Sequence, residues 1–271
     1  MNQLNIFFKS FMLAGVVLFA SCTKVIDIDL NSSDPQIVVE AKISDDAADK
    51  TEVRLTKSVN FSESNTFPPV KNAFVTILDK TDNKIDTLKE ITEGSYQSSK
   101  LTGKTGHTYL LTIKTGDKTI TSTASIPRKV PLTDIETRPQ TLFGQTSYQA
   151  IPRFVDPQGI GDNYRFIMSV NGKAKNQIFV TNDELSDGAP NGRPLFIGAG
   201  DTDFIKIGDT LTLEMQCIDK GVYAYFNSLE DGGGGPGGGT TPVNPLTNIQ
   251  GTGVLGYFSA HTKQVKSVVV R

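Results

Sequence analysis

The chain has 271 residues, and its 27 lysine and arginine residues against 29 aspartate and glutamate residues give a net charge of −2. A chain of this length suits one large or two modest domains with an ample core. The slightly acidic balance, with basic residues that are not clustered, argues against a nucleic-acid-binding surface.

Residues 1–21 are predicted to be a lipoprotein signal peptide. Their apolar run, 11–20, is shorter than the about 20 residues that a membrane-spanning helix needs. Two small residues, Ala20 and Ser21, stand directly before Cys22, as a lipoprotein signal peptidase requires. We therefore expect Cys22 to carry lipid, palmitate included, and to anchor the protein in the cell envelope, at the outer membrane. The alternative is an ordinary secretory peptide that is cleaved at another small residue.

Residues 22–35 are polar and acidic, and we interpret them as a tether between the lipid and the folded body. A first edge strand over 25–30 is the alternative, because apolar and polar residues alternate there. The next segment, 36–127, is predicted to be a β-sandwich, since short runs rich in β-branched residues recur between turn residues without a helical period. The expected strands are 37–43, 53–56, 73–78, 85–90, 94–96, 108–113 and 119–126.

Three prolines, Pro127, Pro131 and Pro139, indicate a linker over 128–147, because proline cannot donate to a sheet ladder. A second β-rich domain is predicted for 148–271. Its expected strands are 148–155, 163–170, 177–181, 194–197, 204–207, 209–218, 248–251, 256–260 and 264–270.

One short amphipathic helix is predicted between Ile218 and Leu229, where apolar residues recur at i, i+4, i+7, i+8 and i+11. The glycine-rich stretch 231–240 is interpreted as a flexible loop, because it lacks the lysine and flanking elements of a phosphate-binding loop. Alternation along 211–217 places Cys217 on the core face of a strand, where a thiol is an inert apolar group. The fold class is therefore mainly β.

Part of the N-terminal half resembles a known module. The phrases at 69–77, 94–96 and 106–113 are similar to the rhythm of carboxypeptidase-regulatory-like and transthyretin-like β-sandwiches. In that module the tyrosines pack into the core after tight turns. The resemblance therefore implies that Tyr96 and Tyr109 are buried.

The whole mature chain resembles the Bacteroidota lipoprotein family catalogued as domain of unknown function 4249. The phrases that carry the resemblance are 154–159, 163–166, 182–188, 208–213, 223–226 and 244–258. The resemblance implies an envelope lipoprotein that is often encoded near a TonB-dependent outer-membrane transporter. It implies no catalytic residues.

The residues point to no enzyme class. A G-x-S-x-G motif is absent, and the two histidines, His107 and His261, are interpreted as structural: His107 as a solvated or capping residue, and His261 as having no nucleophile near it in sequence. Two histidines without a ligand motif do not make a zinc site. We therefore predict no catalytic residue and no cofactor.

The acidic loops are the strongest candidates for a metal-binding or catalytic site. Their oxygen ligands suit Ca²⁺, and paired carboxylates also serve glycosidases. The ordinary alternative is that Asp caps local backbone groups in turns, so no metal is assigned. The calcium candidates are Asp156, Asp162, Asp183, Asp187, Asp201 and Asp203.

The prediction for function is a non-catalytic envelope lipoprotein that binds a partner or ligand, as an accessory to a TonB-dependent transporter. Its expected partners are the membrane, through lipid on Cys22, and that transporter, but no nucleic acid. The alternatives are a structural spacer without a small ligand and an enzyme that uses the acidic loops. The sequence leaves open whether the protein faces the periplasm or the outside.

Overall fold

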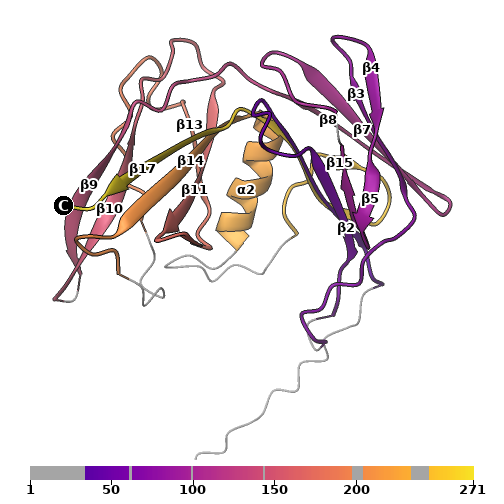
Figure 1. The fold of residues 1–271 in the computed structure, drawn as a ribbon, viewed down its shortest axis with the longest axis horizontal. Coiled ribbons are helices and arrows are strands. Elements are labelled where there is room, and N and C mark those ends of the chain that lie inside the picture. The colour runs from indigo at the N-terminus through magenta and orange to yellow at the C-terminus, as the bar shows by residue number, and fades with distance from the viewer. Residues whose placement is uncertain (1–33, 61–62, 99, 143, 197–203, 233–243) are drawn as a thin grey trace, which may run out of the picture. The chain divides into compact units, whose positions relative to one another are not determined.

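The computed structural model describes residues 34–60, 63–98, 100–142, 144–196, 204–232 and 244–271. Residues 1–21, Cys22 and most of the glycine-rich stretch therefore lie outside the described residues. All the described strands and the helix belong to one compact unit, 35–59 and 63–271. That unit is mainly β (Figure 1), which confirms the predicted fold class.

Two five-stranded sheets form the predicted β-sandwich and share one hydrophobic core. The strands of the first sheet, in spatial order, are β16 (Val254–His261), β1 (Ile37–Ser44), β2 (Glu52–Lys57), β6 (Ser95–Gln97) and β5 (Lys89–Thr92). Those of the second sheet are β15 (Ile249–Gln250), β8 (Lys118–Ser125), β7 (Thr108–Thr115), β3 (Phe74–Asp79) and β4 (Lys84–Thr87).

Alternating burial explains why these segments are strands. In β1 and β7 every second side chain is buried, as expected for strands with one face on a core. Tyr96 and Tyr109 are fully buried, which confirms the expectation from the resemblance. Tyr96 Oη donates to Val70 O at 3.0 Å, and Tyr109 Oη accepts from Lys104 N at 2.8 Å. Each buried hydroxyl thus has a partner.

Strand β16 comes from the far end of the chain and pairs in parallel with β1, from Ile37 opposite Val254 to Ser44 opposite His261. Its Phe258 belongs to the core of the sandwich. The assignment of all of 148–271 to a second domain is therefore wrong for β15 and β16. A pairing between segments this far apart leaves no local signal in the sequence.

A second group of strands is built around β11 (Asn163–Val170), which pairs with β14 (Thr210–Ile218). The other members of this sheet are β12 (Lys173–Ala174), β13 (Phe179–Asn182) and β17 (Gln264–Val269). Cys217, on β14, is buried in the core of this group, as predicted.

A separate two-stranded sheet pairs β9 (Asp134–Leu142) with β10 (Gln145–Arg153). Most of the predicted linker 128–147 is therefore strand. The predicted strands 194–197 and 204–207 are also wrong among the described residues: Leu195 makes one isolated bridge to Ala150, and 204–207 is irregular.

The predicted helix is α2 (Lys220–Gly232). Its Val222 and Phe226 form a small core with Ile218, and the helix contacts β11, β13 and β16. Asp219 caps its start, accepting from Val222 N at 2.9 Å, while the other carboxylate oxygen accepts from Ser125 N on β8. The helix is thus tied to both groups of strands (Figure 1). Among the described helices, none has the length and apolar character needed to cross a membrane.

Candidate functional site

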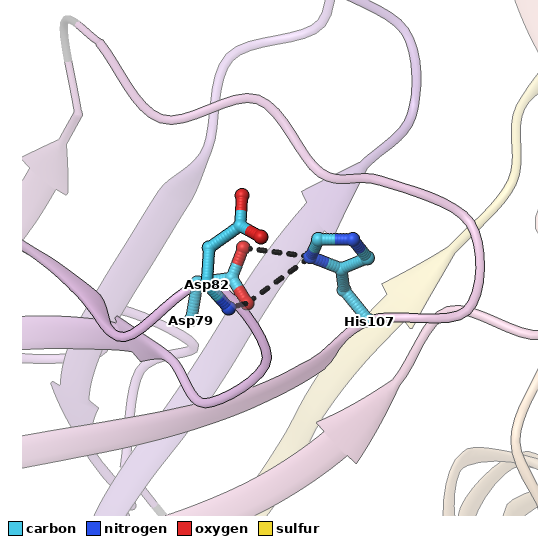
Figure 2. A group of neighbouring side chains, drawn as sticks. All are labelled: Asp79, Asp82 and His107. Atoms are coloured by element: carbon cyan, nitrogen blue, oxygen red, sulfur yellow. Dashed lines mark hydrogen bonds and ion pairs between the residues drawn. The ribbon is translucent and has the colours of Figure 1, made fainter.

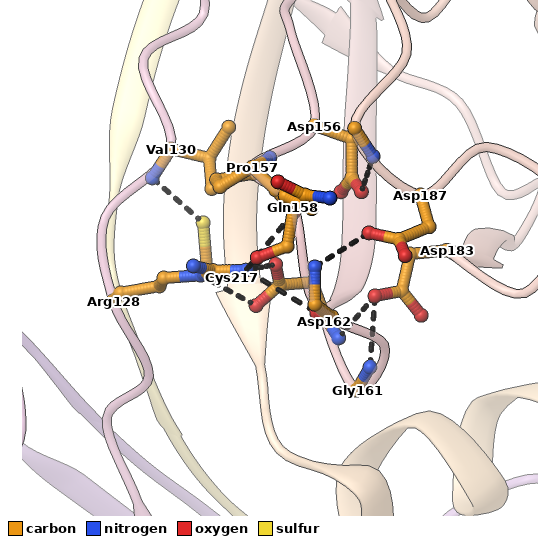
Figure 3. A network of polar contacts seen from close by, with 12 residues as sticks. Arg128, Val130, Asp156, Pro157, Gln158, Gly161, Asp162, Asp183, Asp187 and Cys217 are labelled. Atoms are coloured by element: carbon orange, nitrogen blue, oxygen red, sulfur yellow. Dashed lines mark hydrogen bonds and ion pairs between the residues drawn. The ribbon is translucent and has the colours of Figure 1, made fainter.

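Three of the predicted calcium candidates meet near the start of β11. Asp156 follows β10, Asp162 directly precedes β11, and Asp183 directly follows β13. Because β13 pairs with β11, their loops lie at the same end of the sheet. Each residue offers a carboxylate oxygen, and these oxygens all lie within 4.8 Å of one another (Figure 3).

Asp183 and Asp187 accept hydrogen bonds from backbone N–H groups of the loop between β10 and β11. Asp183 Oδ2 accepts from Gly161 N at 2.8 Å and from Asp162 N at 2.9 Å. Asp187 Oδ1 accepts from Gly159 N at 2.6 Å (Figure 3). These contacts hold the loop between β10 and β11, which contains Gly159 and Gly161, in place. The turn-capping alternative therefore describes what Asp183 and Asp187 do here.

Asp162 pairs with Arg128, a residue of the predicted linker. Arg128 Nε donates to both carboxylate oxygens, at 3.2 and 3.0 Å, and Nη2 donates to Asp162 Oδ2. Nη2 also lies 3.1 Å from the carbonyl oxygen of Pro157. The hydrogen bond with Asp162 raises the pKa of Arg128. Sequence reasoning missed Arg128 because nothing local marks it as a partner of the acidic loops.

Asp156 is fully buried and accepts a hydrogen bond from the hydroxyl of Tyr164 and another from Gly188 N at 3.3 Å. Burial raises the pKa of Asp156, and the hydrogen bond from Tyr164 opposes the rise.

Nearby, Cys217 Sγ accepts from Val130 N at 3.4 Å, and burial raises the pKa of this thiol. Because a nucleophilic cysteine needs the thiolate form, the raised pKa argues against a nucleophilic role for Cys217.

The acidic cluster has the oxygen atoms that a hard cation binds. However, many of these oxygens already accept hydrogen bonds from Arg128, Tyr164 and backbone N–H groups. Calcium binding therefore stays a prediction, which calorimetric titration with Ca²⁺ tests. The other candidates, Asp201 and Asp203, lie outside the described residues, as does Cys22.

A second cluster joins His107, Asp79 and Asp82 at one end of the sandwich (Figure 2). His107 Nδ1 lies 3.1 and 2.9 Å from the two carboxylate oxygens of Asp79. Burial opposes ionisation of Asp79, but hydrogen bonds from His107 and from two backbone N–H groups outweigh it and lower the pKa. His107 is thus a paired, half-buried residue rather than a solvated one.

The other histidine, His261, is buried. Ser259 Oγ lies 2.9 Å from its Nδ1, so a hydroxyl neighbour exists that sequence reasoning missed. Within the described chain, no carboxylate hydrogen-bonds to the ring. The pair therefore lacks the third group that orients the base in a serine hydrolase.

An apolar groove of about 450 Å³ lies beside β13. The side chains that define it are Phe166, Phe179, Val180, Leu195 and Phe196. Phe196 is 56% exposed. Gln177 also lines the groove, and its Oε1 is buried with no hydrogen-bond partner among the described residues. An apolar lining with an unsatisfied acceptor suits a partner that brings apolar side chains and one N–H or O–H donor.

A family model described as "Domain of unknown function (DUF4249)" matches residues 23–267. The match covers every phrase on which the second resemblance rests, and it confirms the resemblance to this domain family. No curated protein matches the chain.

Proposed function

The chain belongs to the DUF4249 family, and from that premise we propose that it is a non-catalytic envelope lipoprotein that binds a partner. In this proposal it serves as an accessory to a TonB-dependent outer-membrane transporter. Lipid on Cys22 attaches it to the outer membrane, and the strand-rich body presents the apolar groove to the partner.

The membrane attachment is supported by the sequence around Cys22. The apolar run 11–20 and two small residues precede the cysteine, and the family match begins at residue 23, directly after it. Each CH₂ group of a bound acyl chain contributes about 0.8 kcal/mol of membrane affinity, and two or more chains give stable anchoring. A tether over 22–35 then carries the body.

The binding role is supported above all by the apolar groove. Monomeric proteins seldom expose large aromatic side chains in a lined depression without a use for them. Phe196 and Phe179 supply apolar area, and Gln177 Oε1 supplies an acceptor that is buried and unsatisfied. A partner segment that covers the groove would shield the exposed aromatic side chains from water and could donate a hydrogen bond to Gln177 Oε1.

The non-catalytic character is supported by the contacts of the acidic loops. Asp162 is paired with Arg128, and Asp183 holds two backbone N–H groups. An acid–base pair needs one carboxyl group that is free to take up and release a proton at the substrate. The groups that could do this work are used to hold the loops together.

Co-purification tests the proposal. Tagged full-length protein is extracted from outer membranes in mild detergent, and the proteins recovered with it are identified by mass spectrometry. We expect enrichment of a TonB-dependent transporter, lost in Phe196→Asp, because a carboxylate in the groove cannot be desolvated against an apolar partner. The control is Phe74→Asp, since Phe74 is exposed to a similar degree (54%) but lies on β3.

Repeated recovery of the wild type without a transporter would contradict the accessory role and favour the spacer alternative. Equal recovery by wild type and Phe196→Asp would leave the accessory role standing and remove the groove from it. Protease treatment of intact cells decides between a periplasmic and an outward-facing body.

A further inference from the structure

A polar pocket of about 260 Å³ lies among strands β1, β11, β14 and β16, and it shares no lining residue with the apolar groove or with the acidic cluster. It takes side chains from both groups of strands. The residues that matter for its chemistry are Lys42, Asp49, Arg165, Glu214, His261 and Lys263.

The two carboxylates of the pocket are already paired with its two lysines. Lys42 Nζ lies 2.8 Å from Asp49 Oδ1. Lys263 Nζ lies 3.5 Å from Asp49 Oδ2 and 3.5 Å from Glu214 Oε2. These four charges sum to zero, so any further charge in the pocket sets its net sign.

That further charge is Arg165. Its guanidinium stacks on Phe226, with Cζ 3.8 Å from the ring centroid, and Nη1 donates to Gln216 Oε1 at 3.3 Å. Among the described residues, no carboxylate lies within ion-pair distance of it. Burial lowers the pKa of Arg165 but leaves the group charged at neutral pH. The charge of Glu214 favours the charged form of Arg165, but the Glu214 carboxylate is also paired with Lys263. The charged side chains of the pocket therefore sum to +1, and an anion that joined them would balance this charge.

His261 lines the same pocket and is 2% exposed. Its Nδ1 is engaged by Ser259 Oγ, and its Nε2 is buried with no hydrogen-bond partner in the part of the chain that the structure describes. Burial, followed by the charge of Arg165, lowers the pKa of His261 to about 4, so the ring is neutral at pH 7. The tautomer decides what Nε2 offers: when Ser259 donates to Nδ1, the ring proton is on Nε2 and this N–H is an unsatisfied donor, which is the tautomer that an oxyanion would select.

We propose that the polar pocket binds the oxyanion group of a small molecule, a carboxylate or a phosphate, between the Arg165 guanidinium and His261 Nε2. Arginine matches such a group because its planar fork of N–H donors fits two oxygens at once. The small volume selects a ligand of few atoms or the acidic end of a longer one. The proposal is independent of the groove and of the transporter.

The chain has only two histidines, and this makes the test specific. Imidazole NMR signals of the full mature protein are followed at constant pH 7 during titration with inorganic phosphate, with acetate and, at matched ionic strength, with sodium chloride. Variant His107→Asn assigns the signals. We expect phosphate or acetate to shift the His261 signals saturably, while His107, which lies with Asp79 in the sandwich, stays in place.

The two probes separate the two sources of the oxyanion. Saturation by phosphate alone identifies a phosphate site, and saturation by acetate alone identifies a carboxylate site. No saturable shift of His261 with either probe, up to about 50 mM, would overturn the proposal, because even a weak ligand with a Kd of about 1 mM would be bound at that concentration. Equal shifts with sodium chloride would overturn it too.

A variant identifies the cation. Arg165→Gln should weaken the saturating probe about tenfold or more, because a charge-assisted hydrogen bond is lost. The matched control, Arg54→Gln, removes an exposed arginine of β2 and should leave the affinity unchanged. Unchanged affinity in a folded Arg165→Gln would contradict the proposal. If that variant does not fold, the titration of the unaltered protein still decides, together with ¹⁵N shifts that report whether Nε2 carries the ring proton.

Discussion

The side chain of Arg128 is exposed, but its guanidinium joins Asp162 to the carbonyl oxygens of the loop between β10 and β11. We predict that Arg128→Gln lowers the free energy of unfolding by about 1 to 3 kcal/mol, the range for hydrogen bonds to charged groups. The measurement is urea denaturation at pH 7.

The matched control is Arg138→Gln, in which an arginine loses an exposed pairing with Glu136. Exposed ion pairs contribute about 0 to 1 kcal/mol, so this change should be small. Equal effects of the two variants would show that Arg128 does not organise the acidic loops.

His261 makes stability depend on pH. Its folded-state pKa, about 4, lies below the ordinary value of 6.5, so between these pH values the unfolded chain binds a proton that the folded chain does not. Its contribution is fully present above pH 6.5 and is lost as the pH falls toward 4. The charged groups that share its pocket are Lys42, Asp49, Arg165, Glu214 and Lys263.

We therefore predict that between pH 6.5 and 4 the wild type loses about 3 kcal/mol more stability than His261→Asn, since one pKa unit corresponds to about 1.36 kcal/mol. Comparing the two proteins cancels the titration of the carboxylates that both share. Parallel pH profiles from urea denaturation would show that the ring is not held neutral.

At the scale of elements, the pairing of β16 with β1 depends on Gly256. Its φ is +105°, and a Cβ atom there would lie 1.9 Å from the carbonyl oxygen of Val39 on β1. Because the obstacle is backbone, the strands would have to separate. We predict that Gly256→Ala lowers the free energy of unfolding by more than about 3 kcal/mol, as for other large steric conflicts.

Gly116→Ala is the control for the dihedral angle alone. Gly116 also has a positive φ, +56°, but nothing lies within 4 Å of the added Cβ. Its expected cost is about 1 to 2 kcal/mol. Thermal or urea denaturation of both variants separates the angle from the close approach, and equal losses would contradict the account of Gly256.

Strands β1, β7 and β8 could be predicted because buried and exposed side chains alternate along them. The predicted strand 85–90 is wrong, since the chain there forms two strands, β4 and β5, which belong to different sheets and show no alternation of burial. Strand β9 could not be predicted, since Pro139 lies inside it and proline usually indicates the end of a strand. The structure pairs β9 only with β10, so its other edge needs no N–H donor and tolerates the proline.

The acidic cluster, too, could be predicted from the sequence only in part. Their aspartates were predictable as one chemical group, because their residue types and spacing are typical of turns and of oxygen ligands. Their convergence could not be predicted, since it depends on the pairing of β13 with β11. Nor could Arg128 or the pocket around Arg165 and His261, which draw residues from distant strands.

At the scale of the whole molecule, the sandwich is completed by strands from the C-terminal end. Phe258 and Ala260 of β16 are fully buried in its core. We predict that fragment 36–127 gives no cooperative unfolding transition, whereas 35–271 unfolds cooperatively, as expected when one core needs both ends of the chain. Circular dichroism during urea titration measures this. A cooperative transition in the fragment would contradict the shared core.

The claim on which the proposed function rests is attachment to a membrane through Cys22. Mass spectrometry of the N-terminal peptide of the protein isolated from its native envelope tests this attachment. We predict that the mature chain begins at Cys22 and carries a thioether-linked diacylglycerol and an amide-linked acyl chain. A mature chain that begins elsewhere, or an unmodified Cys22, would rule out attachment through lipid on this residue.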